Sequence, residues 1–241
     1  NNPNYAGAWL NVIWPFCVST IFQKSFNKQS KFIALVIAIC FGLAIFLTSS
    51  RNAWLGFCLS SYLMIIGLQN LNFLKWIIPL IFTSIFVIIF QSTINNQFSF
   101  IEKIIPNFLY KEIDPSNYAN WDMSRIDIWG RAIEFIIQRP IIGWGSGAFS
   151  ILLFYNYKIY KGHAHNLILE LAVSYGIIVT SIIVFTIAIL LIKSSKKMLI
   201  KKIKIFDKNY NLNIFERAWW VSTFTLLFSQ MLDVQYFDGR I

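Results

Sequence analysis

The sequence has few charged residues, few histidines and no paired cysteines. Only 13% of its 241 residues are charged, whereas a soluble domain carries about 25%. The apolar residues gather in runs close to the ~20 residues needed to cross a bilayer. Cys17, Cys40 and Cys58 lie singly inside such runs, which argues against a disulfide framework or a cysteine-based metal site. We therefore predict an integral membrane protein.

Acidic residues are scarce as well, and the formal net charge of +10 raises the question of nucleic-acid binding. The lysines argue against it, because they gather between apolar runs. The segment "KSSKKMLIKKIKIFDK" (193–208) alone holds seven of them. Loops of this kind remain in the cytoplasm and attract anionic lipid headgroups. The predicted partners therefore include membrane lipids and exclude nucleic acid.

Six apolar runs predict an all-α, polytopic transmembrane bundle, treated as one domain over residues 1–241. The runs lie at about 5–22, 32–50, 52–68, 73–90, 166–192 and 216–235. If the lysine-rich loops are cytoplasmic, the long loop over 91–165 is extracytoplasmic, and so is the tight turn at Ser50-Arg51. The chain opens at "NNPNYAG" and closes at "YFDGRI", and we expect it to be part of a longer protein.

One segment of the long loop, "SRIDIWGRAIEFIIQRP" (124–140), is predicted to be an amphipathic helix. Its apolar residues recur at helical spacing: Ile126, Trp129, Ile133 and Ile136/Ile137. Ser124 and Asp127 form a capping-box start, and Pro140 ends the helix. Such a helix is expected to lie on the outer membrane surface. The following "GWGSG" (143–147) predicts a tight turn with exposed backbone amides.

Three arginines occupy informative positions. Arg51, in "TSSRNAW", either extends to the membrane interface or joins its polar neighbours in an anion site. Arg125 lies at a predicted helix start, where free amides and the helix dipole favour phosphate. Its alternative role is an ion pair with a nearby aspartate. Arg131 follows Asp127 by four residues, a spacing that favours an ion pair within the helix.

The two histidines, His163 and His165, precede an apolar run in "KGHAHNLILELAVSYG". A metal site needs further ligands, and only Glu170 is close in sequence, so no metal is predicted. A neutral imidazole is well suited to take a proton from a hydroxyl near neutral pH. Asn166 or Glu170 would orient the ring. A structural role at the helix start is the alternative.

These motifs together resemble the O-antigen ligase and polymerase superfamily. The segments that carry the resemblance are "NNPNYAGAWL" with its N-P-N-x-x-G pattern, "SSRNAW", "RIDIWGRAIEFIIQRPIIGWGSGAF", "HAHNLILELAVSYGI" with its H-N-x9-G pattern, and "DVQYFDGRI". The last one is similar to the end of the penultimate helix in cyanobacterial-type members. The resemblance covers nearly the whole chain, and family members have more membrane helices than this chain shows.

The resemblance implies a multi-pass protein of the bacterial inner membrane with its active site facing the periplasm. It implies metal-independent, inverting transfer of a glycan from a polyprenyl-diphosphate carrier to a lipid A-core or glycan acceptor, without a cofactor. His165 would be the general base, while Arg51 and Arg125 would bind the diphosphate. His163, Asn166, Glu170 and Arg131 would support them. A small-anion or bicarbonate transporter and a structural partner in envelope assembly remain alternatives.

Overall fold

The computed structural model describes residues 3–23, 25–48, 50–65, 123, 125–195 and 214–234. All regular secondary structure in these residues is helical. The seven helices are α1 (Pro3–Phe22), α2 (Lys28–Leu47), α3 (Arg51–Ile65), α7 (Arg125–Gln138), α8 (Ala148–Tyr157), α9 (Leu167–Ser195) and α10 (Ile214–Gln230). The predicted all-α class is therefore confirmed for the described part of the chain.

Within the described part of the chain, three helices are long and apolar enough to cross a membrane. They are Asn4–Phe22, Lys28–Leu47 and Leu167–Ser195, which correspond to the predicted runs 5–22, 32–50 and 166–192. The runs at 52–68 and 216–235 are represented by α3 and α10, whose described lengths are 15 and 17 residues. The predicted run at 73–90 lies outside the described residues, and so does the first part of the long loop.

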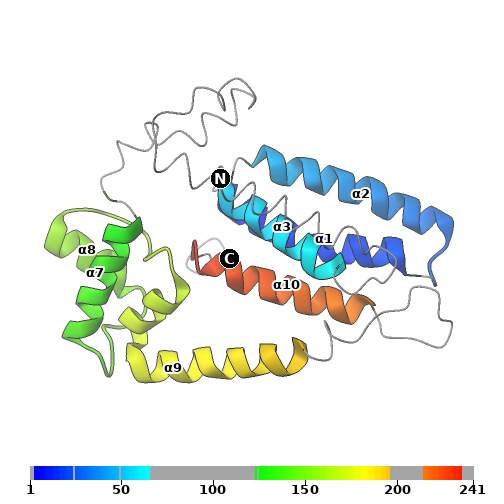
Figure 1. The fold of residues 1–241 in the computed structure, drawn as a ribbon. Helices are drawn as coiled ribbons and strands as arrows, with labels where there is room; N and C mark the ends of the chain where they lie inside the picture. Colours follow the sequence, from blue (N-terminus) through cyan, green and yellow to red (C-terminus); the bar gives the residue numbers. More distant parts are fainter. Residues whose placement is uncertain are drawn as a thin grey trace, which may run out of the picture.

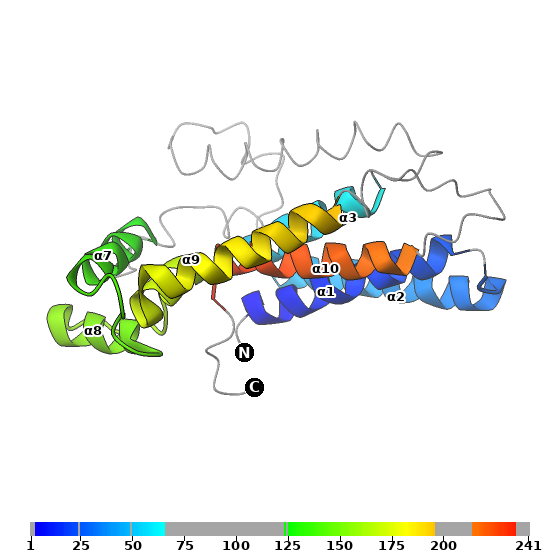
Figure 2. The same cartoon turned by 90° about the horizontal axis from the view of Figure 1, so that it is seen from below.

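The helices form two neighbouring groups (Figure 1). In the first group, α1 packs against α2, α3 and α10, and α3 also packs against α10. In the second, α7 and α8 pack against each other and against α9. The long α9 extends from α7 and α8 along the first group, and it contacts α10 (Figure 2). We call the first group the helical bundle and α7 with α8 the cap.

The tight turn predicted at Ser50-Arg51 is present. Helix α2 ends at Leu47 and α3 begins at Arg51. The hydroxyl of Ser50 accepts a hydrogen bond from the Ala53 amide at 3.2 Å, which satisfies one of the free donors of the first turn of α3. Arg51 is consequently the first residue of a helix that starts at one end of the bundle.

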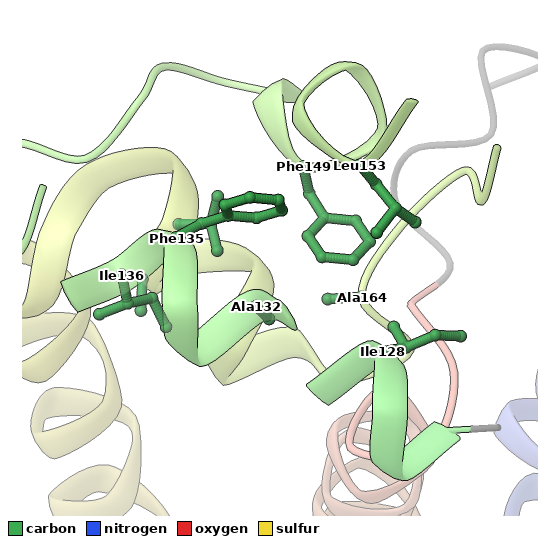
Figure 3. Packing of buried hydrophobic residues seen from close by; sticks show 9 residues of the cluster. Ile128, Ala132, Phe135, Ile136, Phe149, Leu153 and Ala164 are labelled. Carbon is green, nitrogen blue, oxygen red and sulfur yellow. The ribbon is translucent and has the colours of Figure 1, made fainter. Parts of the chain in front are cut away.

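The predicted cap helix is present as well, with a different buried face. Helix α7 runs from Arg125 to Gln138, just before Pro140. However, Ile126, Ile133 and Ile137 are exposed, and the buried face consists of Ile128, Ala132, Phe135 and Ile136. Figure 3 shows this face turned toward Phe149 and Leu153 of α8. Of the predicted apolar stripe, Ile126, Ile133 and Ile137 are therefore on the outside, whereas Ile136 belongs to the buried face. The proposed capping residue Ser124 lies outside the described residues.

Helix α9 is interrupted at Gly176, which has φ 80° and ψ 169°, a conformation that side-chain-bearing residues avoid. The Trp144 and Gly145 amides donate to the carbonyls of Val173 and Ser174 at 2.8 and 2.9 Å. A Cβ on Gly176 would lie 2.0 Å from the carbonyl oxygen of Ile141. The glycine-rich turn thus fastens the cap to the membrane helix. The amides of Gly143, Trp144 and Gly145 are bonded to protein, whereas the sequence predicted exposed amides in this turn.

Candidate active site

The candidate site lies where four helices begin and one ends. Asn4 is in the first turn of α1, Arg51 begins α3, and Arg125 begins α7. His163 and His165 lie in the loop before α9, and Asp233 follows the end of α10. This arrangement brings helix N-termini, which carry positive partial charge, to the same end of the bundle.

Asp233 is at the centre of the site. Its side chain is buried, with 1% relative exposure, and its Oδ1 atom lies 2.9 Å from His165 Nδ1 and 3.5 Å from His163 Nε2. The side-chain amide nitrogen of Asn4 donates to Oδ2 of Asp233 at 2.6 Å. The Ser50 hydroxyl in turn donates to the amide oxygen of Asn4. This series of contacts connects the start of α3 to the carboxylate that faces both histidines.

The carboxylate fixes the tautomer of His165. Burial alone would raise the pKa of Asp233, but the hydrogen bond with His165, the two neighbouring histidines and the Asn4 amide bring that pKa below its usual value. An ionised carboxylate only accepts hydrogen bonds, so Nδ1 of His165 carries the proton. In the neutral imidazole the lone pair then lies on Nε2, the atom that would act as the general base.

His163 is held in the neutral state. Its burial, the neighbouring His165 and the charge of Arg125 lower its pKa to about 4, although Asp233 acts in the opposite direction. Its Nδ1 accepts a hydrogen bond from the backbone amide of His165 at 3.2 Å. The ring proton of a neutral His163 therefore resides on Nε2, facing Asp233. His163 thus contacts both the backbone of the other histidine and its carboxylate partner.

The two arginines lie near this centre. The surrounding protein lowers the pKa of Arg125, the charge of Asp233 raises it, and the charge of Arg51 lowers it. Arg125 nevertheless keeps an exposed surface, while Arg51 is half-buried. A guanidinium remains protonated in either setting. Two cations near one another at converging helix starts form an environment that favours a multiply charged anion.

The sequence suggested Asn166 or Glu170 as the partner that orients His165, and the structure gives each of them a different contact. Asn166 caps α9 by accepting from the Ile168 and Leu169 amides, and it donates to the Met231 carbonyl at 3.2 Å. Glu170 is buried and accepts from the Ala164 amide at 2.7 Å. Both residues position the histidine loop, while Asp233 contacts the ring.

Arg131 is placed elsewhere, in the cap. Its guanidinium contacts Glu134 at 3.1 Å and the Tyr157 hydroxyl at 3.1 Å. The prediction paired Arg131 with Asp127, whereas the structure shows an ion pair within the helix with Glu134, three residues later. The guanidinium also lies 4.2 Å from the centre of the Tyr157 ring. These contacts connect α7 to α8 and give Arg131 a structural role in the cap.

Sequence reasoning missed Asp233 and Asn4. Asp233 is 68 residues from His165, so no local spacing connects them. The available signals were an acidic residue at the end of the last apolar run, which is costly near a membrane, and the second asparagine of the N-P-N pattern. Among the described residues, His163, His165 and Asp233 also form a group with potential metal-ligand atoms within 4.8 Å of one another.

Comparison with known proteins decides the family. The model of the family described as O-antigen ligase matches residues 33–184. This match covers more than half of the 241 residues and includes Arg51, Arg125 and His165. The chain belongs to the O-antigen ligase family. The resemblance seen in the sequence is thereby confirmed, and with it the assignment as a membrane protein, in agreement with the three long apolar helices.

A curated relative of this O-antigen ligase family member is the ComP-specific O-oligosaccharyltransferase of Acinetobacter baylyi. The two are 25% identical over 178 residues, which is 69% of this chain and 30% of the relative. The chain therefore spans only part of that protein's length. No solved structure matches the chain.

Proposed function

We propose that the chain is the catalytic part of a membrane glycosyltransferase that moves a glycan from a polyprenyl-diphosphate carrier to a hydroxyl acceptor. The observation that carries the proposal is the 2.9 Å contact between His165 Nδ1 and Asp233 Oδ1 beside two arginines. Family membership supports the reaction class. The lysine-rich segment at 193–208 supports a periplasmic site, because α9 separates it from the histidine loop.

In the proposed reaction, His165 Nε2 takes the proton of the acceptor hydroxyl. The oxygen attacks the anomeric carbon as the bond from that carbon to the diphosphate breaks, and the anomeric configuration inverts. Asp233 stabilises the imidazolium that forms. Arg51 and Arg125 stabilise the negative charge that accumulates on the departing diphosphate. The arginines supply the charge stabilisation for which other enzymes use a metal ion.

The placement of these groups favours this reaction over transport. A transporter site is expected near the bilayer midplane and at interrupted helices. Arg51, Arg125 and Asp233 instead lie at helix ends. The interruption of α9 at Gly176 is filled by the backbone of the glycine-rich turn. The acceptor is a lipid A-core, another carrier-linked glycan or, by analogy with the oligosaccharyltransferase relative, a protein.

The test uses the full-length protein, reconstituted in liposomes with a fluorescent glycan on a polyprenyl diphosphate, in EDTA. We expect His165→Ala to slow release of the carrier by about 10²–10⁴-fold, the contribution of a general base. Arg125→Ala should slow it by about 10²–10³-fold, as for the loss of one charge-stabilising group. Arg139→Ala is the matched control, because Arg139 follows the other end of α7 and stacks on Trp144.

The acceptor is identified by the product. A ladder of glycan lengths indicates a polymerase, and a single capped lipid A-core or protein indicates a ligase or an oligosaccharyltransferase. Carrier release that survives His165→Ala would contradict the mechanism. Absence of release with all three acceptor types, together with bicarbonate uptake by the same liposomes, would leave the transporter as the function.

A further inference from the structure

Both histidines face the same carboxylate oxygen of Asp233, but the proposed reaction uses only the contact with His165. Acid–base chemistry at His165 requires one carboxylate contact, yet His163 Nε2 also faces the same oxygen, at 3.5 Å. The three potential ligand atoms lie within 4.8 Å of one another. We propose that His163, His165 and Asp233 form a binding site for Zn²⁺, and that the ion inhibits the enzyme by occupying its general base.

The geometry is close to that of a zinc site with three protein ligands. Bonds of about 2.0–2.2 Å to imidazole nitrogen and carboxylate oxygen place ligand atoms roughly 3.3–3.5 Å apart in a tetrahedron. The separation between His163 Nε2 and Asp233 Oδ1 already has this value, and the 2.9 Å separation from His165 Nδ1 must increase. The histidines lie in the loop before α9, which can make this small adjustment, and the fourth position remains for water.

The carboxylate of Asp233 is already oriented as a metal ligand would be. Asn4 donates to Oδ2, so that oxygen is already engaged and Oδ1 is left toward the two histidines. Hydrogen bonds of this type orient carboxylate ligands and raise metal affinity. Metal binding requires both histidines to change tautomer. His163 must move its proton from Nε2 to Nδ1 and give up the 3.2 Å hydrogen bond from the His165 amide, and His165 must move its proton from Nδ1 to Nε2.

Inhibition follows from the tautomer of His165. The active form carries its proton on Nδ1 and has its lone pair on Nε2. Coordination through Nδ1 uses the lone pair of that atom, so the proton must reside on Nε2 instead. A protonated Nε2 is unable to accept a proton from the acceptor hydroxyl. Only this inhibitory part rests on the proposed function, since metal binding is independent of it.

Metal binding is tested with Co²⁺ as a spectroscopic stand-in for Zn²⁺. The full-length protein is purified without an affinity tag and with every cysteine replaced by alanine, because Cys17, Cys40 and Cys58 are free thiols. We expect one Co²⁺ per chain, with the visible absorption of a tetrahedral site, displaced by Zn²⁺. His163→Ala and Asp233→Asn should each weaken binding by more than the roughly 10–100-fold typical of second-shell changes.

Glu134→Gln is the matched control. It alters a carboxylate of the cap that bonds Arg131 and Tyr157, away from the three proposed ligands, and should bind Co²⁺ as the parent does. Thermal unfolding without metal identifies a ligand variant that fails to fold. In that case, Co²⁺ binding by the other ligand variant decides whether the site exists. Binding that is substoichiometric, or unchanged in a folded His163→Ala protein, overturns the site.

The inhibitory part is tested by glycan release in the presence of Zn²⁺. Release should stop as the site fills and resume after EDTA is added. Stoichiometric binding without any effect on release would overturn inhibition and leave the metal site in place. Stoichiometric binding by a protein that transfers no glycan would instead count against the proposed function, so the two failures are distinguishable.

Discussion

The bundle and the cap hold themselves together by different means. The bundle has an apolar core of its own, and its helices also meet through small and polar residues: Gly7 lies against Ala53, and the Ser222 hydroxyl donates to the Val12 carbonyl at 2.7 Å. In the cap, α7 and α8 meet through Phe135 and Phe149, which are 1% and 0% exposed. Lipid tails offer no hydrophobic drive between helices, so close approach and hydrogen bonds associate them. In the cap, burial of aromatic surface does this.

The difference also explains the position of the candidate site. Asn4, Arg51 and Asp233 belong to the bundle, while Arg125 and the histidine loop belong to the cap and its junction with α9. In the proposed function, charged groups at this border avoid the cost of the bilayer interior and lie close to the carrier-linked glycan donor. Changes in either region should therefore affect the site through different physical causes.

The largest expected effect on stability comes from the cap core. Phe135→Ala should destabilise the cap by about 3–5 kcal/mol, because removal of this buried ring leaves a cavity in the cap core. We would measure it by the rate of proteolysis between α7 and α8 and by thermal unfolding. Ile137→Ala is the matched control on the same helix, since Ile137 is 72% exposed. Equal effects of the two substitutions would show that Phe135 does not form the core of the cap.

Much of this arrangement was predictable from the sequence. The long apolar runs gave α1, α2 and α9, and Pro140 gave the end of α7. The buried face of α7 was not predictable, because Ile126, Ile133 and Ile137 form a second apolar stripe on the same helix. Periodicity detects a stripe without telling which one meets protein. Packing against α8, established only in three dimensions, selects Phe135 and its neighbours.

The site residues that could be predicted are those whose role is visible from their neighbours in the sequence. His165 and the arginines were recognisable because each lies at a helix start beside polar residues. Asp233 was not, since its contact with His165 depends on the end of α10 reaching the start of α9. The motif glycines have packing roles: Gly176 admits the backbone of Ile141, and Gly7 admits Ala53. A sequence pattern gives their spacing and leaves their neighbours unknown.

A moderate effect is expected from adding a side chain at the close contact between α1 and α3. A Cβ on Gly7 would lie 2.2 Å from the Cβ of Ala53, so Gly7→Ala must separate the helices and should cost about 1–3 kcal/mol. It should also slow glycan release, because Asn4 lies one turn away on α1 and contacts Asp233. Thermal unfolding in detergent and the release assay would measure the two effects.

Gly130→Ala is the control for Gly7. Gly130 lies in α7 with nothing within 4 Å of its would-be Cβ, so alanine should be tolerated there and should stabilise the helix by up to ~1 kcal/mol. If both substitutions were neutral, the close contact between α1 and α3 would be absent from the protein, and the contrast between bundle and cap would lose its main support.

The smallest effect should come from a single hydrogen bond between bundle helices. Ser222→Ala removes the donor to Val12 and should cost about 0.6 kcal/mol, the average for such bonds in membranes. Thr223→Val is the matched control, because Thr223 bonds within its own helix to the Trp219 carbonyl at 2.9 Å. Thermal unfolding of the two single variants in detergent would measure the difference in stability between them. A cost for Ser222→Ala as large as that of Phe135→Ala would mean that polar contacts, rather than close packing, dominate the bundle.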